Sequence, residues 1–134
     1  MASVRRAAEG KTFRSPTGEV IDEIFGAAAG GADQHSLAHI TLPPGGSSAD
    51  HYHPVAEESY YILKGHGKMS VRDFIKEGEA GEPREFEVGP GDAVAIKINT
   101  WHRIWNHTPD TDLAFIAVCV PAWTPQCSVF AKSD

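Results

Sequence analysis

Short runs of alternating hydrophobic and polar residues follow one another from residue 12 to residue 120. Most end at clusters of Gly, Pro, Asp or Asn, which interrupt strands and favour turns. No stretch has the 3.6-residue period of a long amphipathic helix. The pattern predicts an all-β sandwich or barrel. Its eight expected strands are Glu19–Phe25, Ser36–Leu42, Glu58–Leu63, Lys68–Arg72, Glu85–Val88, Ala93–Lys97, His102–Asn106 and Leu113–Val120.

The chain of 134 residues has the length of one domain. No repeat, low-complexity tract or linker divides it, so we expect a single domain over 1–134 with its core at about 36–120. Residues 1–11 are polar and alanine-rich, and we expect a flexible arm there, with or without one helical turn. The Glu-, Gly- and Pro-rich segment 76–84 is typical of an exposed hairpin loop.

Charge and cysteine content narrow the classes of partner. The chain carries 12 Lys and Arg against 18 Asp and Glu, a formal charge of −6, which argues against a nucleic-acid partner. It lacks both an apolar run of about 20 residues and the apolar segment of a secretory signal. Two cysteines do not form a disulfide framework. We therefore expect a cytoplasmic protein with no membrane partner.

Four residues have the spacing of a metal site. His51 and His53 are two apart, so in a strand their side chains share one face. Glu58 starts one expected strand and His102 opens another. Three imidazoles and one carboxylate suit a divalent first-row transition metal. Taken alone, a His-x-His pair is weak evidence for a metal site, because such pairs are also common on surfaces and in cores. The flanking residues strengthen the evidence.

The flanking residues form two blocks that resemble the two conserved motifs of the cupin superfamily. The first block, GGSSADHYHPVAEESYYILKG, matches at Gly45, His51, His53, Glu58 and Gly65. The second block, GDAVAIKINTWHRIWN, matches at Gly91, His102 and Asn106.

The second block departs from the cupin pattern at two positions. Lys97 stands where the family has Pro, and Asn99 stands where it has a second Gly. Asn is the best substitute for Gly at a left-handed turn position, so the turn can survive. Neither change touches a metal-binding position.

The resemblance implies an antiparallel jelly-roll β-barrel, with a short N-terminal arm and a C-terminal tail added here. It also implies one divalent metal per chain (Fe, Mn, Ni, Co or Zn), held by His51, His53, Glu58 and His102. Glu57 would replace Glu58 only if the strand register slipped by one residue, and the six-residue gap to Gly65 favours Glu58.

Strand alternation assigns further residues to the barrel interior. Tyr60 lies two residues after Glu58 and should point into the cavity, either to donate its hydroxyl to a substrate or to fill the barrel mouth. We take Glu58, as a general base, and Tyr60 as the catalytic candidates. His39 could be an acid or base near the metal only if its face is inward. Cys119 is expected in the core, and Cys127 exposed without a partner that would lower its pKa.

The expected chemistry follows from the ligand set. Four protein ligands on an octahedral ion leave two neighbouring positions, which a substrate with two adjacent oxygens can occupy. We expect an enzyme acting on a small oxygen-rich or aromatic metabolite, with dioxygenase-type chemistry favoured. The alternatives are an isomerase, cyclase or lyase that works by proton transfer, and a non-catalytic barrel that binds small molecules.

The last expectation concerns the oligomeric state of the chain. Open sheet edges need covering, and the arm or the tail Pro121–Asp134 could lie across a neighbour's edge. We therefore expect a homodimer.

Overall fold

The structure, a computed structural model, describes residues 1–15 and 18–132 and is built from strands. The described part contains one 3-10 turn, Ala7–Glu9, and no α-helix. Its strands are β1 (Thr12–Arg14), β2 (Val20–Phe25), β3 (Ser36–Leu42), β4 (His51–Tyr52), β5 (Glu57–Lys64), β6 (Gly67–Lys76), β7 (Glu79–Ala80), β8 (Arg84–Val88), β9 (Ala93–Ile96), β10 (Thr100–Asn106), β11 (Leu113–Val120) and β12 (Val129–Phe130). All eight expected strands are present, with ends shifted by a few residues.

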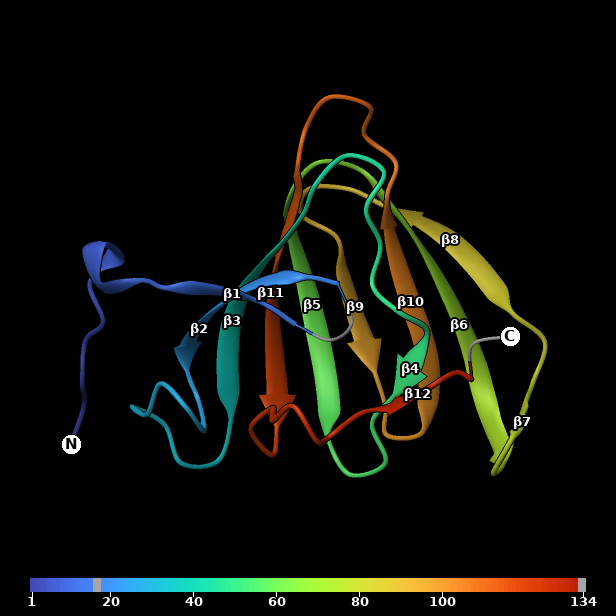
Figure 1. The fold of residues 1–134 in the computed structure, drawn as a ribbon, viewed down its shortest axis with the longest axis horizontal. Coiled ribbons are helices and arrows are strands. Elements are labelled where there is room, and N and C mark those ends of the chain that lie inside the picture. Colours follow the sequence, from blue (N-terminus) through green and yellow to red (C-terminus); the bar gives the residue numbers. More distant parts are fainter. Residues whose placement is uncertain (16–17, 133–134) are drawn as a thin grey trace.

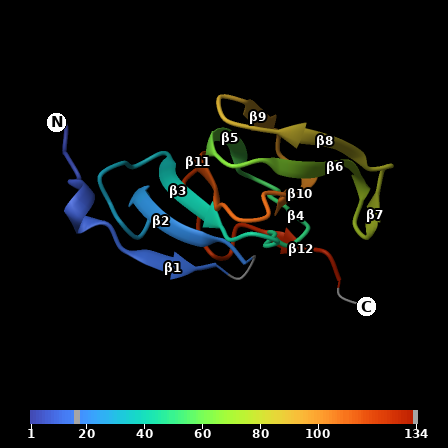
Figure 2. The ribbon, with the colours of Figure 1, turned by 90° about the horizontal axis from the view of Figure 1, so that it is seen from above.

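The strands form two antiparallel sheets that curl toward each other (Figures 1 and 2). The first sheet has the order β1-β2-β3-β11-β5-β9, and the second has the order β12-β4-β10-β6-β7, with β8 also paired to β6. Strands that are distant in sequence become neighbours, because β11 lies between β3 and β5. The expected jelly-roll barrel of cupin type is confirmed.

The core fills the space between the two sheets, and strand alternation decides which residues enter it. Along β5, Glu58, Tyr60 and Ile62 are buried whereas Ser59 and Tyr61 are exposed, as the sequence predicted. The core consists of apolar side chains from both sheets: Ile21, Ile40, Leu42, Tyr60, Ile62, Met69, Val88, Ile96, Ile104, Leu113, Phe115 and Ala117. Charged side chains at inward positions are therefore exceptions that need a reason.

Two turn residues explain how the motif strands are held. Asn99 has φ of 58°, the left-handed conformation expected for it, and its backbone N–H donates to the carbonyl of His53 at 2.9 Å. Gly65 has φ of 82°, and a Cβ there would lie 2.6 Å from the carbonyl oxygen of Asp112. The turn between β9 and β10 therefore survives the loss of the family's glycine, while Lys97 is exposed to solvent.

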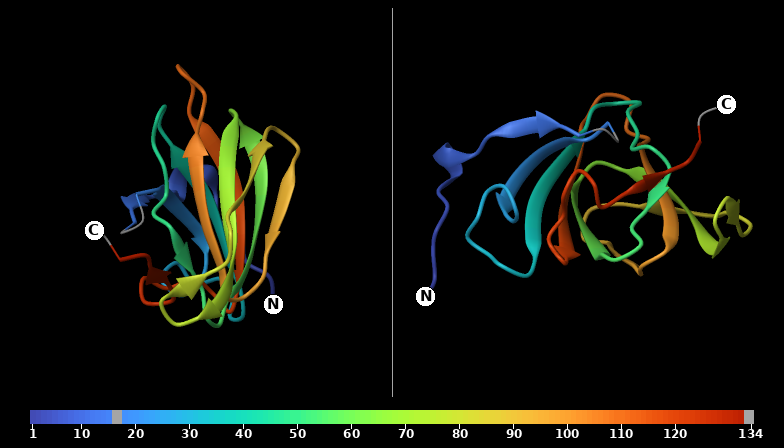
Figure 3. Two further views of the ribbon diagram at one scale, coloured as in Figure 1. Left: turned by 90° about the vertical axis from the view of Figure 1, so that its right-hand side faces the viewer. Right: turned by 60° about the horizontal axis from the view of Figure 1, so that its bottom comes forward.

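The short strands β1, β4, β7 and β12 were not predicted. Within the expected hairpin loop 76–84, β7 pairs back onto β6. At the C-terminal end, β12 pairs with β4 of the same chain, in the register Val129 to Tyr52. Figure 3 shows this C-terminal segment running across one end of the barrel. The part of the tail that the structure describes thus covers an edge of its own barrel. In the arm, Arg5 forms an ion pair with Asp22 of β2.

Candidate metal centre

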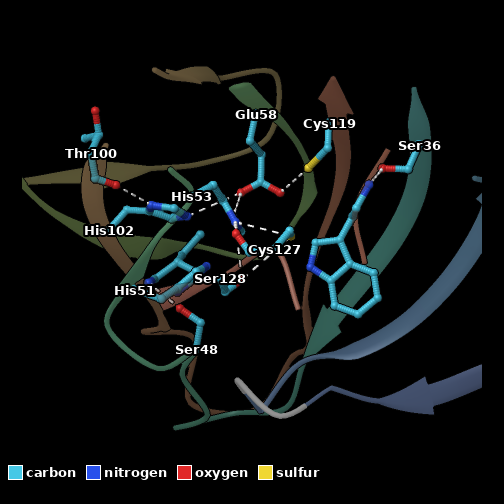
Figure 4. Close-up of polar contacts among 12 residues, drawn as sticks. Ser36, Ser48, His51, His53, Glu58, Thr100, His102, Cys119, Cys127 and Ser128 are labelled. Atoms are coloured by element: carbon cyan, nitrogen blue, oxygen red, sulfur yellow. Dashed lines mark hydrogen bonds and ion pairs between the residues drawn. The ribbon is translucent and has the colours of Figure 1, made fainter. Parts of the chain in front are cut away.

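The four expected ligands meet inside the barrel. His51 belongs to β4, His53 follows that strand directly, Glu58 lies near the start of β5, and His102 is on β10. One ligand atom from each residue lies within 4.8 Å of the others, and all four residues are buried. In Figure 4, the side chains of His53, Glu58 and His102 point toward one another. The structure brings together the group that the sequence proposed.

Strand pairing sets this geometry. His51 and His102 are directly paired across β4 and β10, and their ring centroids are 4.2 Å apart. Glu58 comes from the other sheet, where it pairs with Cys119 on β11 and with Ile96 on β9. The group therefore spans both sheets, and it exists only where the two sheets face each other.

Three buried ligand atoms lack hydrogen-bond partners among the described residues. They are Nε2 of His53, Nε2 of His102 and Oε1 of Glu58. The two imidazole nitrogens lie 3.4 Å and 3.3 Å from Oε1 of Glu58, which is ion-pair range without a hydrogen bond. Buried polar atoms are normally satisfied, and these three converge on one point. The donor set fits a divalent transition metal, which would satisfy all three atoms.

Two of the histidines are oriented by their own local backbone. Nδ1 of His51 lies 2.7 Å from the carbonyl oxygen of Ala49, and Nδ1 of His102 lies 2.8 Å from that of Thr100. A carbonyl accepts only from a protonated Nδ1, so Nε2 is left to bind a metal. Each of these imidazoles is fixed within two residues of its own position.

His53 is oriented by the C-terminal strap, the name used here for residues 121–130. Its Nδ1 lies 3.3 Å from the Cys127 carbonyl oxygen, 3.2 Å from Oγ of Ser128 and 3.5 Å from Sγ of Cys127. These residues follow His53 by 74 and 75 positions. The orientation of His53 therefore depends on a segment that the sequence pattern did not connect to the site.

The expectation for Cys127 was wrong. Burial raises the pKa of its thiol, but the contacts with His53, the Thr124 backbone and Ser128 together lower the pKa overall. Cys119 is buried as expected, yet it also donates a hydrogen bond from Sγ to Oε2 of Glu58 at 3.0 Å. One signal for this contact was available, because the alternation Phe115, Ala117, Cys119 continues the inward face of β11.

Charges within the group are strongly coupled. Burial raises the pKa of Glu58, but His102 and His53 hold it well below its usual range. Burial lowers the pKa of His53, whereas its contact with Cys127 and the nearby Glu58 carboxylate raise it to about 10. Burial and the charge of His102 lower the pKa of His51 to about 3. At neutral pH the metal-free group thus holds an ionised Glu58 beside a protonated His53, while His51 is neutral.

The ligands open onto a cavity with a free volume of about 30 Å³, room for about two water molecules. Burial and the charge of Glu58 raise the pKa of Tyr60 well above its usual value, so the phenol stays protonated. The strap closes part of the wall, and the backbone N–H of Trp123 donates to Oγ of Ser36 at 2.9 Å. The cavity is lined by Glu19, Ile21, Glu23, Ser36, Ala38, Ile40, His51, His53, Glu58, Tyr60, Ala117, Cys119, Trp123 and Ser128.

Three further residues considered from the sequence do not belong to the metal group. His39 alternates with Ala38 and Ile40, which line the cavity, so its face is outward. Glu57 is exposed, so the register slip that would have made it a ligand does not occur. Asn106 is structural, since its Nδ2 donates to the carbonyl oxygens of Leu42 and Thr111.

Two cavity carboxylates were missed. Glu19 directly precedes β2 and Glu23 lies on it, and both line the cavity together with Ile21. Each lies two residues from the core residue Ile21, so alternation would place all three side chains on the same face. This spacing was the available signal. Charged residues at such positions are commonly taken to face solvent, which is why alternation alone did not find them.

Two facing antiparallel sheets with a buried group of three histidines and one glutamate define a cupin barrel with a candidate metal site. The sequence model of the cupin domain family matches residues 38–119, most of the chain and every candidate ligand. The chain belongs to the cupin family.

Relatives of several kinds share this barrel. Auxin-binding protein T85 from Nicotiana tabacum is 28% identical over 111 residues, which cover 83% of this chain and 57% of that protein. Uncharacterized protein MJ1618 from Methanocaldococcus jannaschii is 31% identical over 96 residues, or 72% of this chain and 69% of that protein. The oxalate decarboxylase of Lactobacillus farciminis, solved as a formate complex, superposes with a TM-score of 0.73 and 26% identity over 92% of this chain and 34% of its own. This chain thus spans 57% of the auxin-binding relative and about a third of the decarboxylase.

Proposed function

We propose that the chain is a metal-dependent enzyme that binds a small oxygen-rich metabolite on one divalent metal held by His51, His53, Glu58 and His102. One observation carries this proposal. Three buried ligand atoms lack hydrogen-bond partners among the described residues, and two of the residues that carry them, His53 and Glu58, line a cavity that also contains other ionisable side chains. A purely structural metal site is closed, whereas a catalytic site keeps access for a ligand.

The reaction that the cavity favours is proton transfer, as in an isomerase, cyclase or lyase. A divalent metal, when bound, acidifies a C–H or O–H group next to a coordinating oxygen. Glu19 and Tyr60 line the same cavity as the ligands. A carboxylate can accept a proton from a substrate, and the protonated phenol of Tyr60 can donate a hydrogen bond to a substrate oxygen.

The two carboxylate oxygens of Glu58 have different neighbours. Its Oε1 faces His53 and His102, while its Oε2 accepts the hydrogen bond from Cys119. The Cys119 contact fixes the carboxylate plane, so one oxygen stays directed at the metal position. Its role as a general base would require that oxygen to leave the metal, and we therefore assign proton transfer first to Glu19.

Dioxygenase-type chemistry, which the sequence favoured, is the second candidate. The same four donors accept Fe as well as Zn or Mn, and the strap supplies Trp123 and Ser128 to the cavity wall. The presence of Glu19 and Tyr60 in the same cavity supports proton transfer as the first candidate.

The test begins with elemental analysis of protein prepared without a metal affinity column, beside the His51→Ala variant. We expect one transition metal per chain in the wild type and its loss in the variant. Candidate compounds with two neighbouring oxygens are then incubated with metal-loaded protein, with and without O₂. Turnover without O₂ supports proton transfer, turnover that consumes O₂ supports the dioxygenase, and tight binding without turnover supports the non-catalytic barrel.

A further inference from the structure

Outside the metal group, the charged side chains that line the cavity have one sign. Of its lining residues, Glu19, Glu23 and Glu58 are acidic, and none is Lys or Arg. Glu58 belongs to the metal group, so two carboxylates face the site in addition to the ligands. A cavity built for an anionic substrate usually supplies a cationic side chain, most often Arg, to a carboxylate or phosphate.

The two additional carboxylates are held in place. Glu19 is 6% exposed and accepts a hydrogen bond from Oγ of Ser15 at 3.3 Å. Oε2 of Glu23 accepts hydrogen bonds from the backbone N–H groups of Ala28 and Ala29, at 3.1 Å and 2.6 Å. Backbone donors of this kind stabilise an ionised carboxylate. Both side chains are fixed parts of the cavity wall.

The nearest basic side chains are engaged outside the cavity. Arg5 pairs with Asp22. Arg103 donates to the Ser48 carbonyl and the Ser47 hydroxyl, and its guanidinium stacks on Trp105. Neither arginine lines the cavity. A carboxylate or phosphate that entered would therefore meet negative charge without a compensating cation from the protein.

We infer that the substrate of this site carries no carboxylate or phosphate and is a small neutral or cationic hydrogen-bond donor, such as a polyol or an amino alcohol. The inference rests on the proposed function. A divalent metal and three carboxylates sum to −1, so an anionic substrate would raise the buried negative charge. Hydroxyl and ammonium groups instead donate to Glu19 and Glu23. The oxalate decarboxylase relative is named for a dicarboxylate substrate. The substrate inferred for this cavity is of a different class, because it carries no carboxylate.

The first test measures whether the carboxylates exclude anions. Co²⁺-loaded wild type, Glu19→Gln and Glu23→Gln are titrated with azide, an anion small enough for the cavity, and binding is followed in the visible spectrum. We expect each variant to bind azide about tenfold more tightly than wild type, because one nearby negative charge is removed. The matched control is Glu57→Gln, which makes the same change in net charge at an exposed position and leaves the azide affinity at the wild-type value.

The second test compares ligands that differ only in charge. Glycerate, glycerol and 3-aminopropane-1,2-diol each present neighbouring oxygens and end in a carboxylate, a hydroxyl and an ammonium. We expect the ratio of the glycerate Kd to the aminodiol Kd to fall about tenfold in Glu19→Gln relative to wild type. The inference is overturned if azide affinity and this ratio are unchanged in both cavity variants, or if azide binds none of the proteins. Loss of the proposed function is a separate result, since elemental analysis would then find no metal in any of the proteins.

Discussion

Single residues around the metal group differ in how firmly the chain holds them. His51 and His102 are tied to carbonyls two residues before them, so their orientation is a local property of β4 and β10. Glu58 is held by Cys119 from a neighbouring strand. His53 has no such nearby anchor and depends on the strap. These differences lead to separate predictions for the ligands.

Removal of one locally anchored ligand should abolish most metal binding. In His51→Ala and His102→Ala, metal per chain falls to a small fraction of the wild-type value, because two or three remaining donors bind far more weakly. The melting temperature falls by only a few degrees, since truncation of one buried imidazole costs about 1–3 kcal/mol. Elemental analysis and calorimetry measure the two effects. His39→Ala, outside the site, is the control, and unchanged stoichiometry in both ligand variants would place the metal elsewhere.

Metal uptake should release about one proton per chain near pH 8. The pKa of His53 in the metal-free protein is raised to about 10, so at this pH the imidazole is protonated and the metal must displace its proton. Metal affinity therefore rises as pH increases toward 10. In the metal-free protein, the same shift contributes stability that is complete below the unfolded pKa of about 6.5 and is lost as pH rises through 10.

Titration calorimetry in two buffers of different ionisation enthalpy counts the protons. A value near zero at pH 8 would show that His53 is already neutral before the metal binds. His51 adds no proton to this count, because its pKa is lowered to about 3.

At the scale of elements, the strap links the orientation of a metal ligand to the entry of a substrate into the cavity. It lines the cavity through Trp123 and Ser128, contacts His53, and ends in β12, where Phe130 lies 6.2 Å from the ring of His51. The cavity has room for about two waters, so a larger substrate requires the strap to move. The same movement would release His53.

Loosening of the strap should therefore weaken metal binding without touching a ligand. In Ser128→Ala, one of the contacts to Nδ1 of His53 is lost, and in a chain that ends at residue 122 all of them are lost. We expect the metal Kd to rise a few-fold in the first and about 10- to 100-fold in the second, as for other groups that orient a metal-binding histidine. Competition with a chelating dye gives both values.

Thr108→Ala serves as the control for Ser128→Ala, because its hydroxyl bonds the backbone of His66 on the far side of the fold. Equal metal Kd values for the truncated and full chains would show that the strap covers the site without orienting His53.

Much of the fold was predictable because its signal is local. Eight strands and the inward face of β5 follow from alternation, and Asn99 was correctly assigned to a left-handed turn. Strands β4, β7 and β12 have two residues each, too few to show a period. The contact between His53 and Ser128 joins positions 75 apart, and no local pattern encodes such a contact. Glu19 was missed because charge is usually excluded from inward positions, and alternation alone does not reveal an exception.

For the molecule as a whole, the expectation of a homodimer stays a prediction. The strap pairs with β4 of its own chain, which covers one edge of the second sheet. The first sheet still ends at β1 and β9, and strand edges favour pairing with another chain. Tyr61 and Leu63 on the outward face of β5 are 49% and 43% exposed, and they add apolar surface beside β9.

Sedimentation equilibrium between micromolar and millimolar protein should give the mass of two chains. A mass of one chain across this range would contradict the dimer. Among residues 1–15 and 18–132, no helix is long and apolar enough to cross a membrane.

The position of β11 has a consequence for how the protein is made. This strand comes late in the chain, yet it lies between β3 and β5, which are made much earlier. Because a ribosome synthesises a chain from its N-terminal end, β3 and β5 cannot pair with β11 until residues 113–120 emerge. The anchors of His53 emerge later still, at 127–128. In a nascent chain, the strap therefore cannot orient His53 until residues 127–128 have emerged.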